Sequence, residues 1–175
     1  MRVKTKNILK FLKIISWMIF IGISITAVGL IISFILSFIN TDLMRNNFTD
    51  GDSWYDLKMK SNLLYINSML FNILFSIIHT YIWYLIIQLL SKINLTNPFT
   101  LYVSRKLELI AYLLITLGIL SIIGNKIFSE LLHQYNLKFA FEFDGGYLFI
   151  AGIVFIISQI FKRGIEIQEE NELTV

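Results

Sequence analysis

The stretch SNLLYINSMLFNILFSIIHTYIWYLIIQLLS, residues 61–91, decides the fold of this chain, because its 31 positions contain no Asp, Glu, Lys or Arg. A helix of about 20 apolar residues suffices to cross the hydrocarbon core of a bilayer. Three further stretches have the same character: 28 uncharged residues follow Lys13, 17 follow Glu108 and 17 follow Asp144. The sequence therefore predicts an all-α integral membrane protein, a bundle of four transmembrane helices.

The predicted spans cover about residues 14–38, 63–90, 109–126 and 145–161. Their apolar runs are unbroken, whereas a transmembrane barrel would show alternating segments of about ten residues. No segment between the spans is long enough to bury a core of its own. We therefore expect residues 1–175 to form a single membrane domain.

Lysine and arginine are distributed unevenly between the two sides of the predicted bundle. The N-terminal segment, the loop between the second and third spans and the C-terminal tail hold ten, and the other two loops hold five. The positive-inside rule then places both termini in the cytoplasm. The first apolar stretch is too long for a cleavable signal peptide and is expected to remain as a span. Heavy use of Ile, Phe, Asn and Lys is typical of AT-rich bacterial genomes, so the expected location is a bacterial cell membrane.

Enzymatic chemistry finds little support in the residues. The chain has no cysteine, which excludes thiolate catalysis and cysteine-based metal sites. The two histidines, His79 and His133, fall in a span and in an outer loop, and no nucleophile elbow, phosphate loop or pair of intramembrane carboxylates is present. We expect a non-enzymatic protein with no cofactor and no metal. The two basic residues directly before the third span, Arg105 and Lys106, carry too little charge for direct binding of nucleic acid.

The second span carries a polar face made by Ser68, Asn72, Ser76 and His79, at positions i, i+4, i+8 and i+11. A titratable residue inside a membrane often marks an ion pathway or a ligand site. Polar side chains also form interhelical hydrogen bonds in membranes, each contributing about 0.6–2 kcal/mol. The sequence leaves both interpretations open.

The first span carries small residues on one helical face: Gly22, Thr26, Gly29, Ser33 and Ser37. Such a stripe lets a second helix approach closely. The stripe predicts packing inside the bundle and leaves a homo-oligomer open.

The loop before the third span contains the only proline. Thr96 or Asn97 could cap a helix that begins at Pro98, since proline needs no N–H partner there. The basic residues Arg105 and Lys106 follow, and we expect them at the inner interface, where cations meet anionic lipid headgroups.

Of the two outer loops, only the second shows a local pattern. Phe128, Leu131 and Leu132 have the spacing of a short surface helix. No element is predicted between the first and second spans.

Two motifs resemble the DUF2975 family, small bacterial four-span membrane proteins of unknown function. The first is Asn97-Pro98-Phe99-Thr100 with Arg105-Lys106-Leu107 downstream, and the second is Gly164 with the ending Ile167-Gln168-Glu169-Glu170-Asn171-Glu172-Leu173-Thr174-Val175. The chain departs from the family pattern at Ile167 and Glu172, where leucine and aspartate are usual. Its basic stretch before the third span is also thinner.

The resemblance implies a partner, because members are often encoded beside small helix-turn-helix regulators. Both motifs fall on the predicted cytoplasmic side, so our leading hypothesis is partner binding through residues 97–106 and 164–175. The candidate residues are Asn97, Pro98, Phe99, Arg105, Lys106, Gly164, Gln168, Glu169, Glu170, Asn171, Glu172 and Leu173. The alternative is a small transporter, permeation element or immunity-type accessory protein that uses the polar face of span two.

Overall fold

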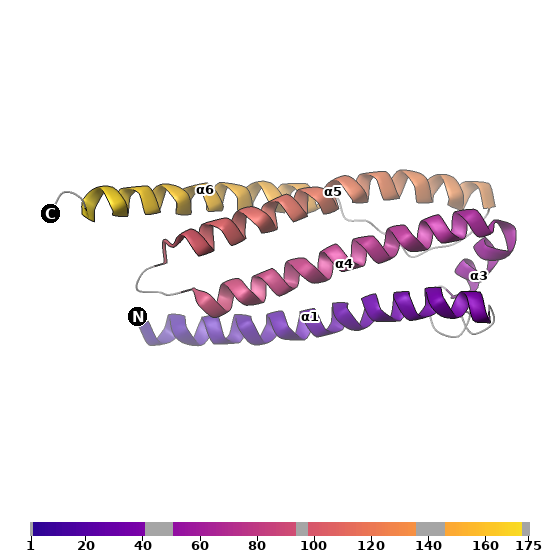
Figure 1. The fold of residues 1–175 in the computed structure, drawn as a ribbon, viewed down its shortest axis with the longest axis horizontal. Helices are drawn as coiled ribbons and strands as arrows, with labels where there is room; N and C mark the ends of the chain where they lie inside the picture. Colours follow the sequence, from indigo (N-terminus) through magenta and orange to yellow (C-terminus); the bar gives the residue numbers. More distant parts are fainter. Residues whose placement is uncertain (1, 41–50, 94–97, 136–145, 173–175) are drawn as a thin grey trace. The chain divides into compact units, whose positions relative to one another are not determined.

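The computed structural model describes residues 2–40, 51–93, 98–135 and 146–172, with the backbone alone for residues 2–6, 51–53, 131–133 and 135. In these ranges all regular structure is helical (Figure 1). The helices are α1 (Arg2–Ile39), α3 (Gly51–Lys60), α4 (Asn62–Lys92), α5 (Leu101–Tyr135) and α6 (Gly146–Glu172). Asn97 and Leu173, both candidate partner-binding residues, lie outside the described residues.

Four helices in the described part of the chain are long and apolar enough to cross a membrane: Asn7–Ile39, Asn62–Lys92, Leu101–Glu130 and Gly146–Glu172. They correspond one to one with the four predicted spans, so the prediction of a multi-pass, all-α membrane protein is confirmed. In the most apolar window of α5, 39% of the residues are buried, against 11–17% in the other three. In the other three helices, most residues of this window are therefore not buried inside the protein and are available to contact lipid.

The helices form two compact units. Unit 1 contains α1 up to Ile21, α4 from Tyr81, α5 up to Gly118, and α6. Unit 2 contains the remainder of α1, α4 and α5 together with α3. The expectation of one domain over residues 1–175 stays a prediction.

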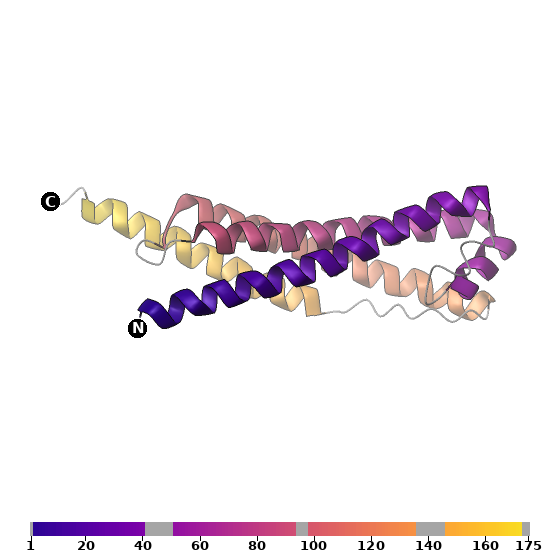
Figure 2. The ribbon, with the colours of Figure 1, turned by 90° about the horizontal axis from the view of Figure 1, so that it is seen from below.

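In unit 1, α6 runs antiparallel to the first half of α5 (Figure 2). The rings of Tyr112 and Phe155 lie 6.2 Å apart between centroids. Nearer the start of α5, the hydroxyl of Ser104 donates a hydrogen bond to the carbonyl of Ser158 at 3.3 Å. Because Ser104 and Ser158 are both buried, the two backbones approach closely at this point.

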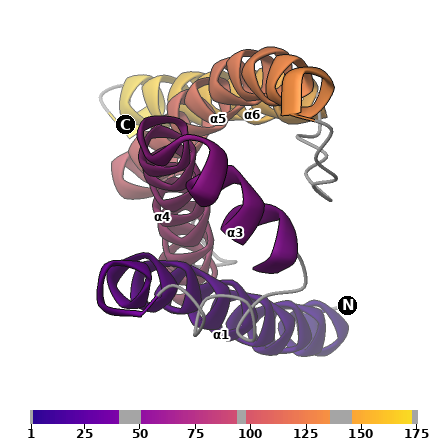
Figure 3. The same cartoon turned by 90° about the vertical axis from the view of Figure 1, so that its right-hand side faces the viewer.

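Unit 2 has an aromatic core to which the short helix α3 contributes side chains. Figure 3 shows the ribbon of this helix next to the start of α4. Trp54 and Leu57 of α3 are buried together with Tyr65, Met69 and Phe128 of α4 and α5. The indole of Trp54 lies edge-on to the rings of Tyr65 and Phe128, at 6.2 and 6.5 Å between centroids. Edge-to-face rings at these distances attract each other beyond their apolar burial. The α3 helix is thus a packed element of unit 2.

A second contact of α3 lies at the C-terminal end of α1. The ammonium group of Lys58 donates a hydrogen bond to the carbonyl of Ser37. It also lies 5.4 and 5.6 Å from the ring centroids of Phe38 and Tyr65. Burial lowers the pKa of Lys58 below its usual value, while a cation is favoured beside the last carbonyls of a helix. Lys58 therefore acts as a tertiary cap for α1.

Three local predictions differ from the structure. The helix α3 was not predicted, because its ten residues are mostly polar; among those described, Trp54 and Leu57 are buried in the core and Tyr55 packs against it. The short surface helix expected near Phe128 is instead the continuation of α5, which runs without a break to Tyr135. A helix start at Pro98 was wrong: α5 begins at Leu101.

Candidate functional site

The two family-like motifs meet in unit 1 at one aromatic contact. The ring of Phe99 packs against Phe161 of α6, with 5.2 Å between centroids. It also covers Gly164, where an added Cβ would lie 2.6 Å from a ring carbon of Phe99. Only a residue without a side chain permits this approach. The Phe99–Gly164 junction thus joins the segment before α5 to the C-terminal turns of α6.

The segment that carries Phe99 is held by a cap on α5. The backbone N–H of Ser104 donates to the carbonyl of Thr100 at 3.1 Å, and the N–H of Val103 donates to its hydroxyl at 3.4 Å. Thr100 is therefore the N-cap of α5, in place of the predicted Thr96 or Asn97. Because the cap directly follows Phe99, the cap and the junction fix each other's position.

Beyond Gly164, α6 continues as a helix to Glu172. Arg163 donates a hydrogen bond to the carboxylate of Glu166 at 2.7 Å, and both side chains are largely exposed. The exposed residues after this pair are Ile167, Glu169, Glu170, Asn171 and Glu172, whereas Gln168 is half-buried. The helical tail therefore presents an acidic surface that includes one isoleucine, 46% exposed.

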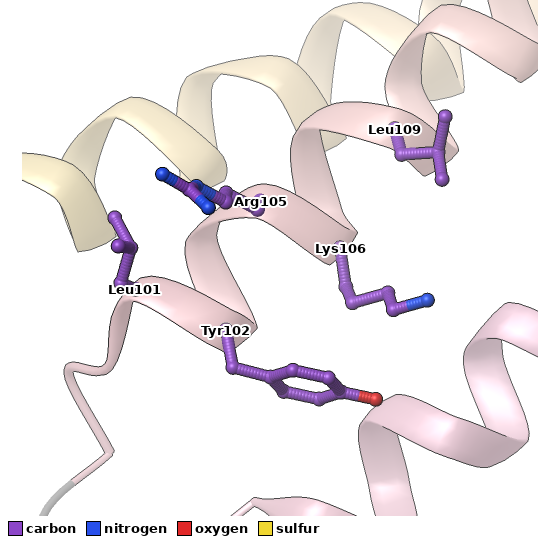
Figure 4. Close-up of a pocket in the computed structure, with 5 residues that line it drawn as sticks. All are labelled: Leu101, Tyr102, Arg105, Lys106 and Leu109. Atoms are coloured by element: carbon purple, nitrogen blue, oxygen red, sulfur yellow. The ribbon is translucent and has the colours of Figure 1, made fainter.

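Arg105 and Lys106 line a cavity of about 380 Å³ on α5 together with Leu101, Tyr102 and Leu109, here called the Tyr102 pocket (Figure 4). The ammonium groups of Lys92 and Lys106 lie 4.6 and 5.8 Å from the centroid of the Tyr102 ring. Both distances are within the range of cation–π attraction. Tyr102 and Lys92 were missed at the sequence level, because only the fold brings the end of α4 beside the start of α5.

The polar face of span two lies in unit 2, and the side chain of its asparagine is hydrogen-bonded within α4. Asn72 is buried, and its side-chain amide donates to the carbonyl of Ser68 at 2.9 Å. The carbonyl of Ser76 accepts a hydrogen bond from Thr80 at 2.8 Å. His79 is half-buried, with its ring 6.4 Å from that of Phe75 between centroids. The bond of Asn72 is one that helix packing explains, and the choice between packing and an ion pathway stays a prediction.

A cavity of about 200 Å³ adjoins one end of this polar face. Its lining is Leu64, Asn67, Ser68, Phe71, Ile127 and Phe128. Of the four predicted polar residues, Ser68 alone belongs to this lining. Within the described ranges, no group of three or more His, Cys, Asp or Glu side chains could hold a metal ion.

The small residues of the first span are of two kinds in the structure: some are buried, and others have open space around them. Ser33 and Ser37 are buried, as packing requires. At Gly22 and Gly29 an added Cβ would meet no atom within 4 Å, and Thr26 is exposed. The packing prediction therefore holds for the C-terminal part of the stripe alone.

These features were compared with known proteins. A family model described as a protein of unknown function, DUF2975, matches residues 55–175. The chain belongs to the DUF2975 family. The matched region includes both motifs on which the resemblance was based, and the Phe99–Gly164 junction lies within it. Neither the curated proteins nor the solved structures gave a significant match.

Proposed function

We propose that this DUF2975 protein is a non-enzymatic membrane anchor whose cytoplasmic end binds a soluble partner protein. The proposed binding surface consists of the Phe99–Gly164 junction and the exposed C-terminal turns of α6. The observation that supports it is the seating of Phe99 on Gly164, since this contact makes one surface of two motifs that lie 65 positions apart.

The surface has a definite chemistry. Glu169, Glu170 and Glu172 are exposed, and Ile167 provides an apolar contact among them. Electrostatic complementarity favours a basic partner surface. A helix-turn-helix regulator has such a surface, because it neutralises DNA phosphates with Lys and Arg. Binding of the regulator to the tail would then compete with binding of the regulator to DNA.

The proposal requires that this end of the protein face the cytoplasm, as the ten-to-five distribution of Lys and Arg predicts. The chain contains no cysteine, so single cysteines can be labelled without background. Ser129→Cys and Asn171→Cys place probes at exposed positions at the end of α5 and in the tail. In intact cells an impermeant maleimide should label the first and spare the second. Labelling of Asn171→Cys alone would reverse the orientation and remove the proposal.

The binding test is capture of a soluble protein by the tagged full chain from native membranes. Gly164→Leu should displace Phe99 and reduce capture at least tenfold, whereas Gly152→Leu is the matched control, because nothing lies within 4 Å of a Cβ at Gly152. Replacement of the three exposed tail glutamates by glutamine should weaken capture and reduce its salt dependence. The proposal would be contradicted if the Gly164→Leu variant, the Gln variant and a chain lacking residues 164–175 all captured as much protein as the unchanged chain.

A second candidate, a small permeation, transport or immunity-type accessory protein, draws on the cavity beside Ser68. It ranks lower because Asn72 bonds within its own helix. His79→Ala and Asn72→Ala would distinguish the two. Loss of activity at an unchanged protein level would favour the second candidate, and a parallel loss of protein level would favour packing.

A further inference from the structure

Among the described residues, no carboxylate pairs with the basic side chains at the Tyr102 pocket. Lys92 and Lys106 approach the same tyrosine ring, and Arg105 is exposed at the edge of the pocket. Within the described ranges, no acidic side chain lies within ion-pairing distance of these three groups. The nearby carboxylate of Glu108 instead accepts a hydrogen bond from the hydroxyl of Tyr112 at 3.2 Å. An anion placed beside the Lys92 and Lys106 ammonium groups would relieve their mutual repulsion.

The remaining lining of the pocket is apolar. Leu101 and Leu109 stand at its two ends along α5, and Tyr102 and Lys106 extend from the same side of the helix between them (Figure 4). One turn beyond Leu109, Tyr112 is 51% exposed. A ligand that extends along α5 from the cations would therefore pass from a charged region onto apolar side chains.

The pocket also lies at one end of a membrane-spanning helix. The candidate span Leu101–Glu130 is 30 residues long, whereas about 20 suffice to cross the hydrocarbon core. The first turns of α5 can thus lie at headgroup level, where basic pockets between transmembrane helices bind anionic headgroups. A soluble phosphate would match the cations but would leave the exposed leucines Leu101 and Leu109 uncovered.

We propose that the Tyr102 pocket binds one anionic phospholipid of the surrounding bilayer. Its phosphate would lie beside Lys92 and Lys106 at the Tyr102 ring, and an acyl chain would lie along Leu109 and Tyr112. This inference goes beyond the proposed function and does not depend on it, because the tail of α6 contributes no residue to the pocket.

The test uses the full chain purified in a neutral detergent. Phosphatidylglycerol, or phosphatidylcholine with the same acyl chains, is titrated in, and lipid-bound protein is counted by native mass spectrometry. We expect saturable retention of one phosphatidylglycerol and weak, non-saturable retention of phosphatidylcholine. Since each basic residue near the surface contributes about a fivefold gain in affinity, Lys92→Gln with Lys106→Gln should weaken binding roughly 30-fold.

Three controls make the result specific. Lys10→Gln with Lys13→Gln removes the same charge from α1 in unit 1 and should leave binding within about twofold. Lys92→Arg with Lys106→Arg keeps the charge and should retain most of the affinity, which separates charge loss from misfolding. A chain lacking residues 164–175 should also retain the lipid, so a failure of the proposed function leaves this test unaffected.

Several outcomes would overturn the proposal. Equal retention of the two lipids would show that charge is not recognised. Unchanged affinity in the Gln double variant would place the lipid elsewhere, as would equal losses in the α1 control. Full displacement of phosphatidylglycerol by millimolar glycerol 1-phosphate would identify a soluble phosphate as the ligand instead.

Discussion

The α5–α6 seam of unit 1 and the core around α3 in unit 2 differ in the size of the side chains that pack there. The α5–α6 seam of unit 1 depends on small residues, namely Ser104, Gly118, Ala151, Ser158 and Gly164. The core of unit 2 depends on large residues, namely Trp54, Leu57, Tyr65, Met69 and Phe128.

The difference follows from the solvent of each contact. Helix α3 falls outside the four apolar spans, so burying its apolar side chains removes them from water and gains about 25 cal/mol per Å². Between α5 and α6 that gain is small, because lipid tails are as apolar as the side chains they would replace. Close backbone approach and interhelical hydrogen bonds then decide the association. Large side chains fill the core around α3 in unit 2, whereas small residues allow the close approach of α5 and α6 in unit 1.

The largest effect is expected from Trp54→Ala in unit 2. Trp54 is 1% exposed and contacts two rings, so its truncation should cost about 3–5 kcal/mol of unfolding free energy. The measurement is unfolding of the full chain in mixed micelles by increasing SDS, followed by far-ultraviolet circular dichroism. Trp17→Ala is the matched control, since Trp17 is 44% exposed and should cost much less. Equal losses in both variants would mean that α3 contributes little to the stability of unit 2.

The seam of unit 1 should respond to the opposite change, the addition of a methyl group. Gly164→Ala places a Cβ 2.6 Å from the Phe99 ring and should cost about 1–3 kcal/mol. Gly152→Ala, in the same helix, meets no atom within 4 Å and should be neutral or stabilising by up to about 1 kcal/mol. The same SDS titration measures both variants. If Gly164→Ala were as stable as Gly152→Ala, close approach would not be what stabilises the seam.

A smaller effect is expected where α3 caps α1. Lys58→Met keeps the length of the side chain but leaves the carbonyl of Ser37 without its donor. We expect a loss of about 0.5–1.5 kcal/mol, from the hydrogen bond and the helix dipole together. Lys60→Met, two positions further on at an exposed site, should change stability by less than half of that. Hydrogen exchange at the last turn of α1 should rise in the Lys58 variant; unchanged exchange there would exclude the capping role.

The smallest effect is expected from Tyr65→Phe in the aromatic core. The hydroxyl of Tyr65 is buried near Ser37, but within the described part of the chain it makes no hydrogen bond. The hydroxyl of Ser37 donates its hydrogen bond to the carbonyl of Phe34, at 2.7 Å. Removing an unpartnered buried hydroxyl should be neutral or stabilising by about 1 kcal/mol. A clear destabilisation in the SDS titration would reveal a partner for this hydroxyl.

The four spans could be predicted from sequence because bilayer thickness sets a length that uncharged runs either reach or do not. The same reasoning underestimated α5, which continues past Lys126 to Tyr135. It also did not predict α3, because the charged residues of this helix surround its two core residues in the sequence. The composition of a segment indicates whether it lies in lipid or in water. Whether a segment outside the bilayer forms a helix depends on the residues that it packs against.

The candidate site shows the same division. The Asn97–Thr100 and Gly164–Val175 motifs could be found by resemblance, and the family match supports them. Their meeting at Phe99 could not be predicted, and neither could the hydrogen bond between Ser104 and Ser158. Serine and glycine at these positions have no periodic signal that distinguishes them from other small residues in the spans.

The sequence by itself determined that the chain is helical, that it crosses a membrane and that it belongs to its family, because hydrophobic run length and local motifs are properties of neighbouring residues. Tertiary structure alone decided which small residues form a seam, which ring covers Gly164 and which cations surround Tyr102. The physical reason is that the seam, the ring over Gly164 and the approach of Lys92 to Tyr102 join different segments that only the fold brings together. The energies of these contacts depend on distances of a few ångströms that only the packed helices establish.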